Sequence, residues 1–191
     1  MSKKVAIIGS GNVGKALRQG LERTGYEVRA AGRGQVTETA GWADVIILAV
    51  PFGALTDVAH ELQKSADGKP VIDVTNALTP DMQLALGFST SGGEELQKAI
   101  PRARVVKAFN TIFAKHMSSG SVGGQQLTLF AASDDEVARK TVLKLGSDLG
   151  FDAVDAGPLK NARHLEAIGY LNIQLGYMLG HGPDTGFKYV H

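Results

Sequence analysis

The feature that most constrains the fold of this chain is a glycine motif near its start, Gly9-Ser10-Gly11-Asn12-Val13-Gly14. The motif has the spacing G-x-G-x-x-G, follows an apolar run at residues 5–8 and opens a segment of helical periodicity at residues 13–23. In this context the first glycine permits a tight turn, the second lets backbone approach a pyrophosphate, and the third lets helix and strand pack closely. A turn alone would not need all three glycines, so we predict a dinucleotide-binding loop.

Short apolar runs alternate with amphipathic segments along the rest of the chain. Strands are predicted at residues 5–8, 27–31, 45–50, 71–74, 104–108, 127–131 and 152–155. Helices are predicted at residues 13–23, 53–63, 94–100, 134–149 and 161–179, with a very short helix at most between 32 and 42 and a long loop over 78–93. Continuous apolar strands are typical of a sheet covered on both faces.

This order predicts an α/β fold of the Rossmann type, with a doubly wound, mostly parallel sheet and a small C-terminal helical segment. We expect residues 1–155 to form the dinucleotide-binding domain. Residues 156–191 should form a helical segment of the same compact unit.

Composition excludes several function classes. The chain has 191 residues and no cysteine, which removes disulfides and thiolate chemistry, and its five histidines have no ligand spacing, so we expect no metal site. Lysines and arginines number 20 against 19 acidic residues, without a long run of one sign, so neither nucleic acid nor a membrane is an expected partner. With no signal-like core, a cytoplasmic location is expected.

The end of the second predicted strand indicates which dinucleotide binds. An NAD site places a carboxylate there to hold the ribose hydroxyls. Here the strand runs into Gly32-Arg33-Gly34 and no carboxylate is present. A guanidinium grips a 2′-phosphate, which a carboxylate would repel, so Gly32 and Arg33 favour NADP(H) over NAD(H).

The ends of the next three strands supply the remaining candidates, since ligands of open α/β sheets bind outside the carboxyl ends of the strands. Apolar side chains could flank a nicotinamide, and amide or hydroxyl groups could bond its carboxamide or an acceptor. Each could also serve the core or a turn, and the argument rests on the group. The candidates are Val50, Pro51, Phe52, Asn76, Phe109, Asn110 and Thr111.

Three segments resemble the NADPH-dependent coenzyme F420 (deazaflavin) reductases and their dinucleotide-binding relatives, over nearly the whole chain. They are residues 5–14 with Arg33, the stretch Val106-Lys107-Ala108-Phe109-Asn110-Thr111-Ile112, and residues 155–163, which are the most specific. The resemblance implies hydride transfer between NADP(H) and a deazaflavin or flavin-like acceptor, with the acceptor pocket completed by the last helix. The family often has Ser or Thr beside the arginine, whereas glycines flank Arg33 here.

No catalytic residue is predicted, because a cofactor and a stacked ring can exchange hydride with only positioning by the protein. Reduction of a carbonyl or imine, as in pyrroline-5-carboxylate reductases, would need a proton donor, for which Lys107 and His116 are candidates. A non-enzymatic NADP(H) sensor is the other alternative. Lys160, Arg163 and Lys188 could attract the anionic groups of an acceptor.

The last predicted helix is apolar over more than one face. Tyr170, Tyr177 and Leu179 widen a stripe formed by Leu165, Ile168, Leu171, Leu175 and Met178. One buried face would account for the stripe alone. The excess apolar area predicts a homodimer.

Overall fold

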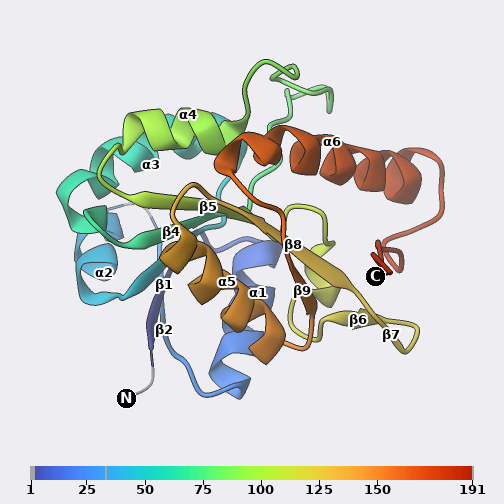
Figure 1. The fold of residues 1–191 in the computed structure, drawn as a ribbon, viewed down its shortest axis with the longest axis horizontal. Coiled ribbons are helices and arrows are strands. Elements are labelled where there is room, and N and C mark those ends of the chain that lie inside the picture. Colours follow the sequence, from blue (N-terminus) through green and yellow to red (C-terminus); the bar gives the residue numbers. More distant parts are fainter. Residues whose placement is uncertain (1–2, 33, 191) are drawn as a thin grey trace.

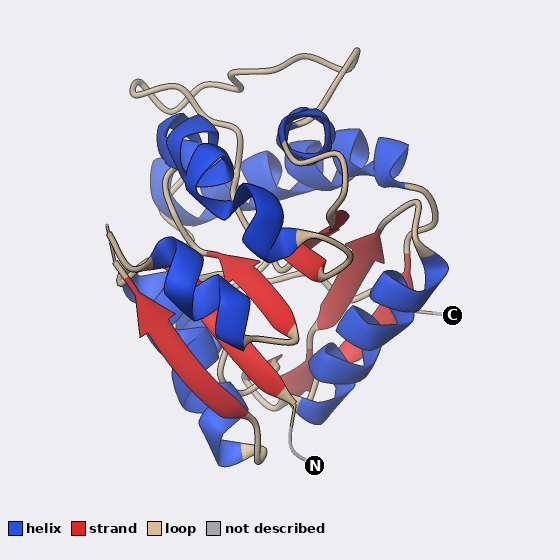
Figure 2. Ribbon diagram, turned by 90° about the vertical axis from the view of Figure 1, so that its left-hand side faces the viewer, coloured by secondary structure: helices blue, strands red, loops and turns tan. Residues whose placement is uncertain are grey.

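The computed structural model describes residues 3–32 and 34–190, which form a seven-stranded sheet with helices on both faces (Figures 1 and 2). The strand order is β2-β1-β3-β4-β5-β8-β9, and every pairing is parallel except that of β5 with β8. The strands are β1 (Lys4–Ile8), β2 (Glu27–Ala31), β3 (Val45–Leu48), β4 (Pro70–Asp73), β5 (Arg104–Ala108), β8 (Thr128–Ala132) and β9 (Asp152–Asp155). The predicted α/β fold with a mostly parallel sheet is confirmed.

The helices divide between the two faces because successive strand side chains point to opposite sides. Val5 and Ile7 of β1 pack with one cluster, together with α1 (Asn12–Arg23) and α5 (Glu136–Asp148). Ala6 and Ile8 pack with the other, together with α2 (Val36–Trp42), α3 (Leu55–Leu62) and α4 (Gly92–Ala99). Burial on both faces explains why the central strands read as continuous apolar runs.

The topology fixes where a ligand can bind. After β2 the chain crosses to β3 on the opposite side of β1, so the connections from β1 and β3 leave the sheet in opposite directions. A crevice opens at such a switch point, at the carboxyl ends of the strands. Helix α6 (Ala162–Ile173) lies across this end of the molecule beside α4 (Figure 1).

Several element boundaries differ from the sequence-based prediction. Helix α4 begins at Gly92 because the Ser91 hydroxyl accepts a hydrogen bond from Glu94 N, and α5 begins at Glu136 because Asp135 caps it in the same way. The last helix ends at Ile173 and continues as a wider π turn, η5 (Gln174–Met178). None of the helices in residues 3–32 and 34–190 is long and apolar enough to cross a membrane.

A hairpin that was not predicted joins β6 (Ser121–Val122) to β7 (Gln125–Gln126). Gly123 and Gly124 form its two-residue turn with φ of 53° and 76°. Positive φ at both turn positions is what this tight hairpin requires, and glycine adopts it without steric cost.

The C-terminal segment returns to the sheet after η5. Strand β5 pairs with only the last two residues of β8. Thr128 is the first residue of β8, and both its backbone and its side chain contact the C-terminal segment. Thr128 N donates to Phe187 O at 3.1 Å, and Tyr189 N donates to Thr128 Oγ1 at 2.9 Å. Residues 187–189 therefore lie beside the part of β8 that β5 does not reach.

Candidate functional site

The glycine motif forms the turn between β1 and α1, and two of its glycines are required by close backbone contacts. Gly9 has φ of 123°, and a Cβ there would lie 2.1 Å from Ala49 O. A Cβ on Gly14 would lie 2.4 Å from Gly9 O. At Gly11, by contrast, a Cβ would meet nothing within 4 Å, so the space beside this backbone is open to a ligand. Ser10 lies between Gly9 and Gly11 in the same turn.

The start of α1 suits an anion. Its N-cap is Gly11, and no side chain among the described residues caps the helix, whereas α4 and α5 are capped by Ser91 and Asp135. The first-turn N–H groups of a helix have no intrahelical partner and lie at the positive end of its dipole. At α1 these groups are left for a bound anion such as a pyrophosphate.

A cavity of about 320 Å³, called here the loop cavity, lies beside this turn. It is bounded by the start of α1 and by the segments that follow β3 and β4, as the switch-point argument predicts. Its lining includes many of the sequence-predicted residues: Gly11, Asn12, Val13, Val50, Pro51, Phe52 and Asn76, together with Ala49, Val74 and Thr75.

A second cavity of about 260 Å³, the helix cavity, adjoins the loop cavity. The two share Asn12, Val13, Val74 and Asn76. Its remaining wall combines the segment after β5 with α6 and η5: Asn110, Ile112, Phe113, Ala114, Met117, Gly169, Asn172, Ile173 and Tyr177. Of these, only Asn110 was among the predicted site residues.

Two asparagines bind each other where the two cavities meet. Asn76 Nδ2 donates to Asn110 O at 3.0 Å, and Asn110 Nδ2 donates to Asn76 Oδ1 at 3.1 Å and to Leu165 O at 2.8 Å. A Cβ on Gly169 would lie 2.4 Å from Asn76 Oδ1, so only glycine lets α6 approach this closely. Further along α6, Asn172 Nδ2 donates to Thr111 O at 3.1 Å.

Two buried polar atoms of these strand ends have no hydrogen-bond partner among the described residues, Thr75 Oγ1 and Asn110 Oδ1. The orientation of the Asn110 amide is set by its nitrogen, which donates to two oxygens. A buried polar atom without a partner costs about 1–3 kcal/mol, so a ligand that supplies one recovers that free energy. Both residues line the cavities.

The other predicted site residues lie elsewhere. Phe109 is fully buried at the end of β5 with φ of 66°, and its ring contacts Phe151 edge-on with centroids 5.9 Å apart. Thr111 is also buried, and its carbonyl accepts from Asn172. Gly32 is exposed directly after β2. Arg33 lies outside the described residues.

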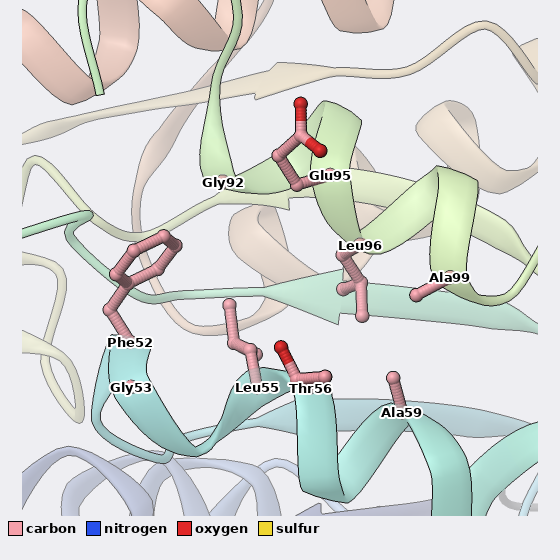
Figure 3. A pocket seen from close by; sticks show the side chains of 9 residues that line it. All are labelled: Phe52, Gly53, Leu55, Thr56, Ala59, Gly92, Glu95, Leu96 and Ala99. Carbon is pink, nitrogen blue, oxygen red and sulfur yellow. The ribbon is translucent and has the colours of Figure 1, made fainter. Parts of the chain in front are cut away.

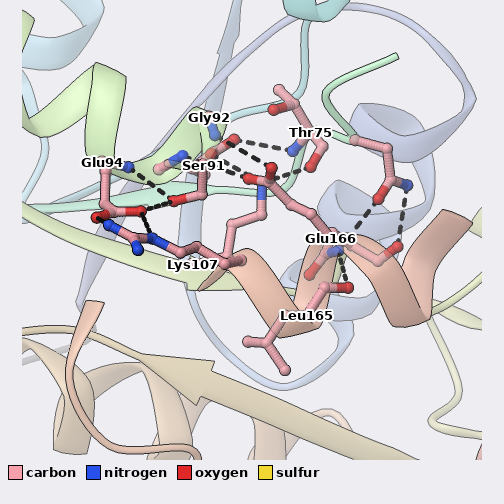
Figure 4. A network of polar contacts seen from close by, with 12 residues as sticks. Thr75, Ser91, Gly92, Glu94, Lys107, Leu165 and Glu166 are labelled. Atoms are coloured by element: carbon pink, nitrogen blue, oxygen red, sulfur yellow. Dashed lines mark hydrogen bonds and ion pairs between the residues drawn. The ribbon is translucent and has the colours of Figure 1, made fainter. Parts of the chain in front are cut away.

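Beneath α6 lies a buried ion cluster that the sequence did not predict (Figure 4). Lys107 Nζ lies 2.9 Å from Asp73 Oδ2, 2.9 Å from Glu166 Oε1 and 2.6 Å from Thr75 O. Burial would lower the pKa of Lys107, but the two carboxylates outweigh it, and the pKa is raised. Lys107 is therefore held charged in an internal cluster, and it lines neither cavity.

The second carboxylate of this cluster is balanced by a helix start. Gly92 N donates to Glu166 Oε2 at 3.1 Å, and Gly93 N donates to Glu166 Oε1 at 3.4 Å. Two carboxylates thus share one ammonium group, and that of Glu166 also lies at the positive end of α4. The cluster joins β4, β5, α4 and α6, and it fixes the helix that walls the helix cavity.

The remaining candidate proton donor, His116, is likewise occupied, because its Nε2 lies 2.9 Å from Pro183 O and the side chain is buried. A smaller cavity of about 160 Å³ lies between α3 and α4 (Figure 3). Phe52 lines both this cavity and the loop cavity.

Comparison with known proteins adds to this geometry. Residues 4–43 and 33–77 match the model of a family described as NADP oxidoreductase, coenzyme F420-dependent. Metalloreductase STEAP3 of Rattus norvegicus is 32% identical over 183 residues, which are 86% of this chain and 36% of the relative. Metalloreductase STEAP2 of Homo sapiens is 28% identical over 180 residues. The chain thus spans about a third of the length of these curated relatives.

Two solved structures are similar in fold. A protein from Arthrobacter sp. FB24 described as a candidate F420-dependent NADP reductase has a TM-score of 0.92 and 24% identity, with all of both chains covered. The hypothetical protein SMa0349 of Sinorhizobium meliloti has a TM-score of 0.69 and 30% identity, covering 83% of this chain and 86% of that one.

Proposed function

We propose that this chain is a member of the family of coenzyme F420-dependent NADP oxidoreductases, whose model its residues 4–77 match, and that it is an enzyme that transfers a hydride between NADP(H) and a deazaflavin or flavin-like acceptor. The observation that carries the proposal is the pair of adjoining cavities beside the glycine motif. The loop cavity suits a dinucleotide, and the adjoining helix cavity has room for part of a further ligand beside that dinucleotide.

The residues of the loop cavity fit NADP(H). The backbone at Gly11, which has open space beside it, and the uncapped start of α1 would hold the pyrophosphate. Val50 and Phe52 would flank the part of the cofactor that carries the nicotinamide. When bound, NADP(H) supplies or accepts the hydride. Arg33 would hold the 2′-phosphate, which is the basis for proposing NADP(H) rather than NAD(H).

The lining of the helix cavity supports an aromatic acceptor. Its walls combine apolar side chains with four amide side chains, those of Asn12, Asn76, Asn110 and Asn172. Apolar walls would exclude water and hold a flat ring, while the amides would fix its orientation by hydrogen bonds.

The same lining offers few groups for carbonyl or imine reduction, which needs a proton donor. Tyr177 is the one side chain with an ionisable proton among the described residues that line either cavity. Lys107 is held by two carboxylates, and His116 faces a carbonyl. Transfer between two redox rings requires no such donor from the protein.

The test is to mix the purified protein with NADPH and a panel of acceptors that includes coenzyme F420, FMN and riboflavin, and to follow the loss of NADPH absorbance. We expect oxidation with at least one acceptor, and slower oxidation by the Gly11→Ala variant at NADPH concentrations below saturation. No oxidation with any acceptor, combined with tight NADPH binding and a nucleotide-dependent change of assembly, would support a sensor instead.

We also propose that the protein is a cytoplasmic homodimer that joins through the last helical segment. Leu171, Met178 and Leu179 are each at least half exposed there. Exposed apolar side chains gathered on one element favour association with a second copy. Analytical ultracentrifugation of the protein and of a Leu171→Glu/Leu179→Glu variant tests this: a monomeric variant supports the surface, and a monomeric unmodified protein contradicts it.

A further inference from the structure

We propose that a third cavity, on the outer side of α1, binds an anionic group carried by the tail of the acceptor. This outer cavity measures about 460 Å³. It is lined by Asn12, Lys15, Ala16, Gln19, Phe113, Ala114, Lys115, Ser118, Tyr177 and Pro183. The inference rests on the proposed function, because it assigns a place to the part of the acceptor that does not react.

The outer cavity continues the helix cavity. The two share Asn12, Phe113, Ala114 and Tyr177 as lining residues. Phe113 and Tyr177 pack edge to face with their ring centroids 5.1 Å apart, and they form the boundary between the two spaces. A ring seated in the helix cavity could therefore extend a substituent past this aromatic pair without crossing the protein core.

The two spaces differ in charge. The helix cavity has amides and apolar walls, whereas the outer cavity adds the ammonium groups of Lys15 and Lys115. Lys15 has no ion pair or hydrogen bond through its side chain with any described residue. A lysine without a partner, at the mouth of a cavity, is available to an anion of a ligand.

The other charged groups around this cavity leave it positive. Lys115 pairs with Asp184 at 2.7 Å, and both side chains are more than half exposed. Such an exposed pair is weakened by water and salt, so an incoming anion can compete for Lys115. Arg23 adds a third cation close by, since its guanidinium donates to Ser118 O.

The cations expected from the sequence to attract the acceptor lie elsewhere. Arg163 donates to both carboxylate oxygens of Glu94, at 2.8 and 2.7 Å, and is held there. Neither Lys160 nor Lys188 lines the loop, helix or outer cavity. Lys15 and Lys115 are therefore the cations that the cavity system presents to an acceptor.

The experiment compares ligand pairs that differ in an anionic tail: riboflavin with FMN, and the bare deazaflavin chromophore with coenzyme F420. Dissociation constants are measured by quenching of ligand fluorescence, with saturating NADP⁺ present. We expect the unmodified protein to bind the tailed member of at least one pair about tenfold more tightly, which corresponds to about 1.4 kcal/mol.

The Lys15→Gln/Lys115→Gln variant should bring that ratio close to one, while the affinity for the tail-less ligand and for NADP⁺ stays unchanged. Lys64→Gln is the matched control, because Lys64 is another exposed lysine without a side-chain partner among the described residues, and it lines none of these cavities. It should leave the ratio intact.

The proposal is overturned if neither pair binds, if tailed and tail-less ligands bind equally, or if the lysine variant keeps the preference. Failure of the proposed function is distinguishable, since it appears as tail-dependent binding without any oxidation of NADPH. A preference that Lys64→Gln also removes would indicate general charge attraction and would overturn the assignment to this cavity.

Discussion

Lys107 of β5 and Glu166 of α6 form an ion pair of 2.9 Å in which the lysine side chain is fully buried and the glutamate is 5% exposed. The two residues are 59 positions apart in sequence but adjacent in the fold, and Asp73 and the start of α4 complete the cluster around them. The pair fixes the helix that forms one wall of the helix cavity. We therefore expect the loss of this ion pair to lower the stability of the fold.

Replacing Lys107 by Met should destabilise the protein by about 3–5 kcal/mol, because Asp73 and Glu166 would remain buried without their shared counter-charge. Urea denaturation followed by circular dichroism measures this change. Lys98→Met removes an exposed pair with Glu95 and should cost less than about 1 kcal/mol. Similar losses in the two variants would contradict the role assigned to the buried cluster.

Gly169→Ala should disturb the site more than it disturbs the fold. The new Cβ would lie 2.4 Å from Asn76 Oδ1 and 2.8 Å from Asn110 Nδ2, so α6 or the amide pair must move. We expect kcat/KM to fall about tenfold to a hundredfold, as a misplacement of about 1 Å can produce. Gly41→Ala is the control, since nothing lies within 4 Å of its Cβ, and it should leave kcat/KM unchanged.

Gly11→Ala and Gly9→Ala should separate binding from folding. A Cβ on Gly11 has open space, so the variant should keep the melting temperature of the unmodified protein but bind NADPH at least about tenfold more weakly. Gly9→Ala should instead lower the melting temperature, because its Cβ meets Ala49 O at a positive φ. Calorimetry and nucleotide titration report the two effects, and unchanged NADPH affinity in Gly11→Ala would refute the phosphate assignment.

The ion pair between Glu94 and Arg163 should make stability depend on pH. The hydrogen bonds from Arg163 hold the pKa of Glu94 below its ordinary value of 4.5. A depressed carboxylate pKa contributes stability above pH 4.5, and this contribution is lost as the pH falls through the folded-state pKa.

Glu94→Gln should thus be less stable than the unmodified protein at pH 7, and the difference should narrow below pH 4.5. Unfolding free energies measured at several pH values test this. A difference that stays constant across the range would mean that the ionised form of Glu94 contributes nothing.

Arg33→Ala should weaken NADPH binding by about 1–3 kcal/mol and affect NADH little, from the loss of a charge-assisted contact. This prediction comes from the sequence, since Arg33 lies outside the described residues. Equal losses for NADPH and NADH in a titration would assign Arg33 a general role rather than recognition of the 2′-phosphate.

Local signals in the sequence predicted the fold well. The runs that became β2, β5 and β9 were predicted with their observed bounds, although each strand includes charged residues. The capped starts of α4 and α5 differ by two residues from prediction, since the decisive contacts are side-chain caps at Ser91 and Asp135. The hairpin at Gly123 and Gly124 was missed because its two strands have only two residues each.

The site was predictable only in part. The glycine motif and the residues after β3 and β4 follow from chain order, because strand ends share one crevice. The contribution of α6 was not predictable, since Gly169 and Asn172 acquire their roles only by contact with residues 59 or more positions earlier. For the same reason the sequence indicated Lys107 as a candidate proton donor. In the structure its partners Asp73 and Glu166 hold it away from both cavities.

The return of residues 187–189 to β8 has a consequence for aggregation. Where β5 stops short, Thr128 N would otherwise be an unpaired donor at an open strand edge, a ready template for a strand from another molecule. Phe187 O accepts a hydrogen bond from that donor, and the ring of Tyr189 packs edge-on against Phe130 with the ring centroids 6.2 Å apart. This short segment thus protects the sheet from intermolecular pairing, a task that none of the cavity residues performs.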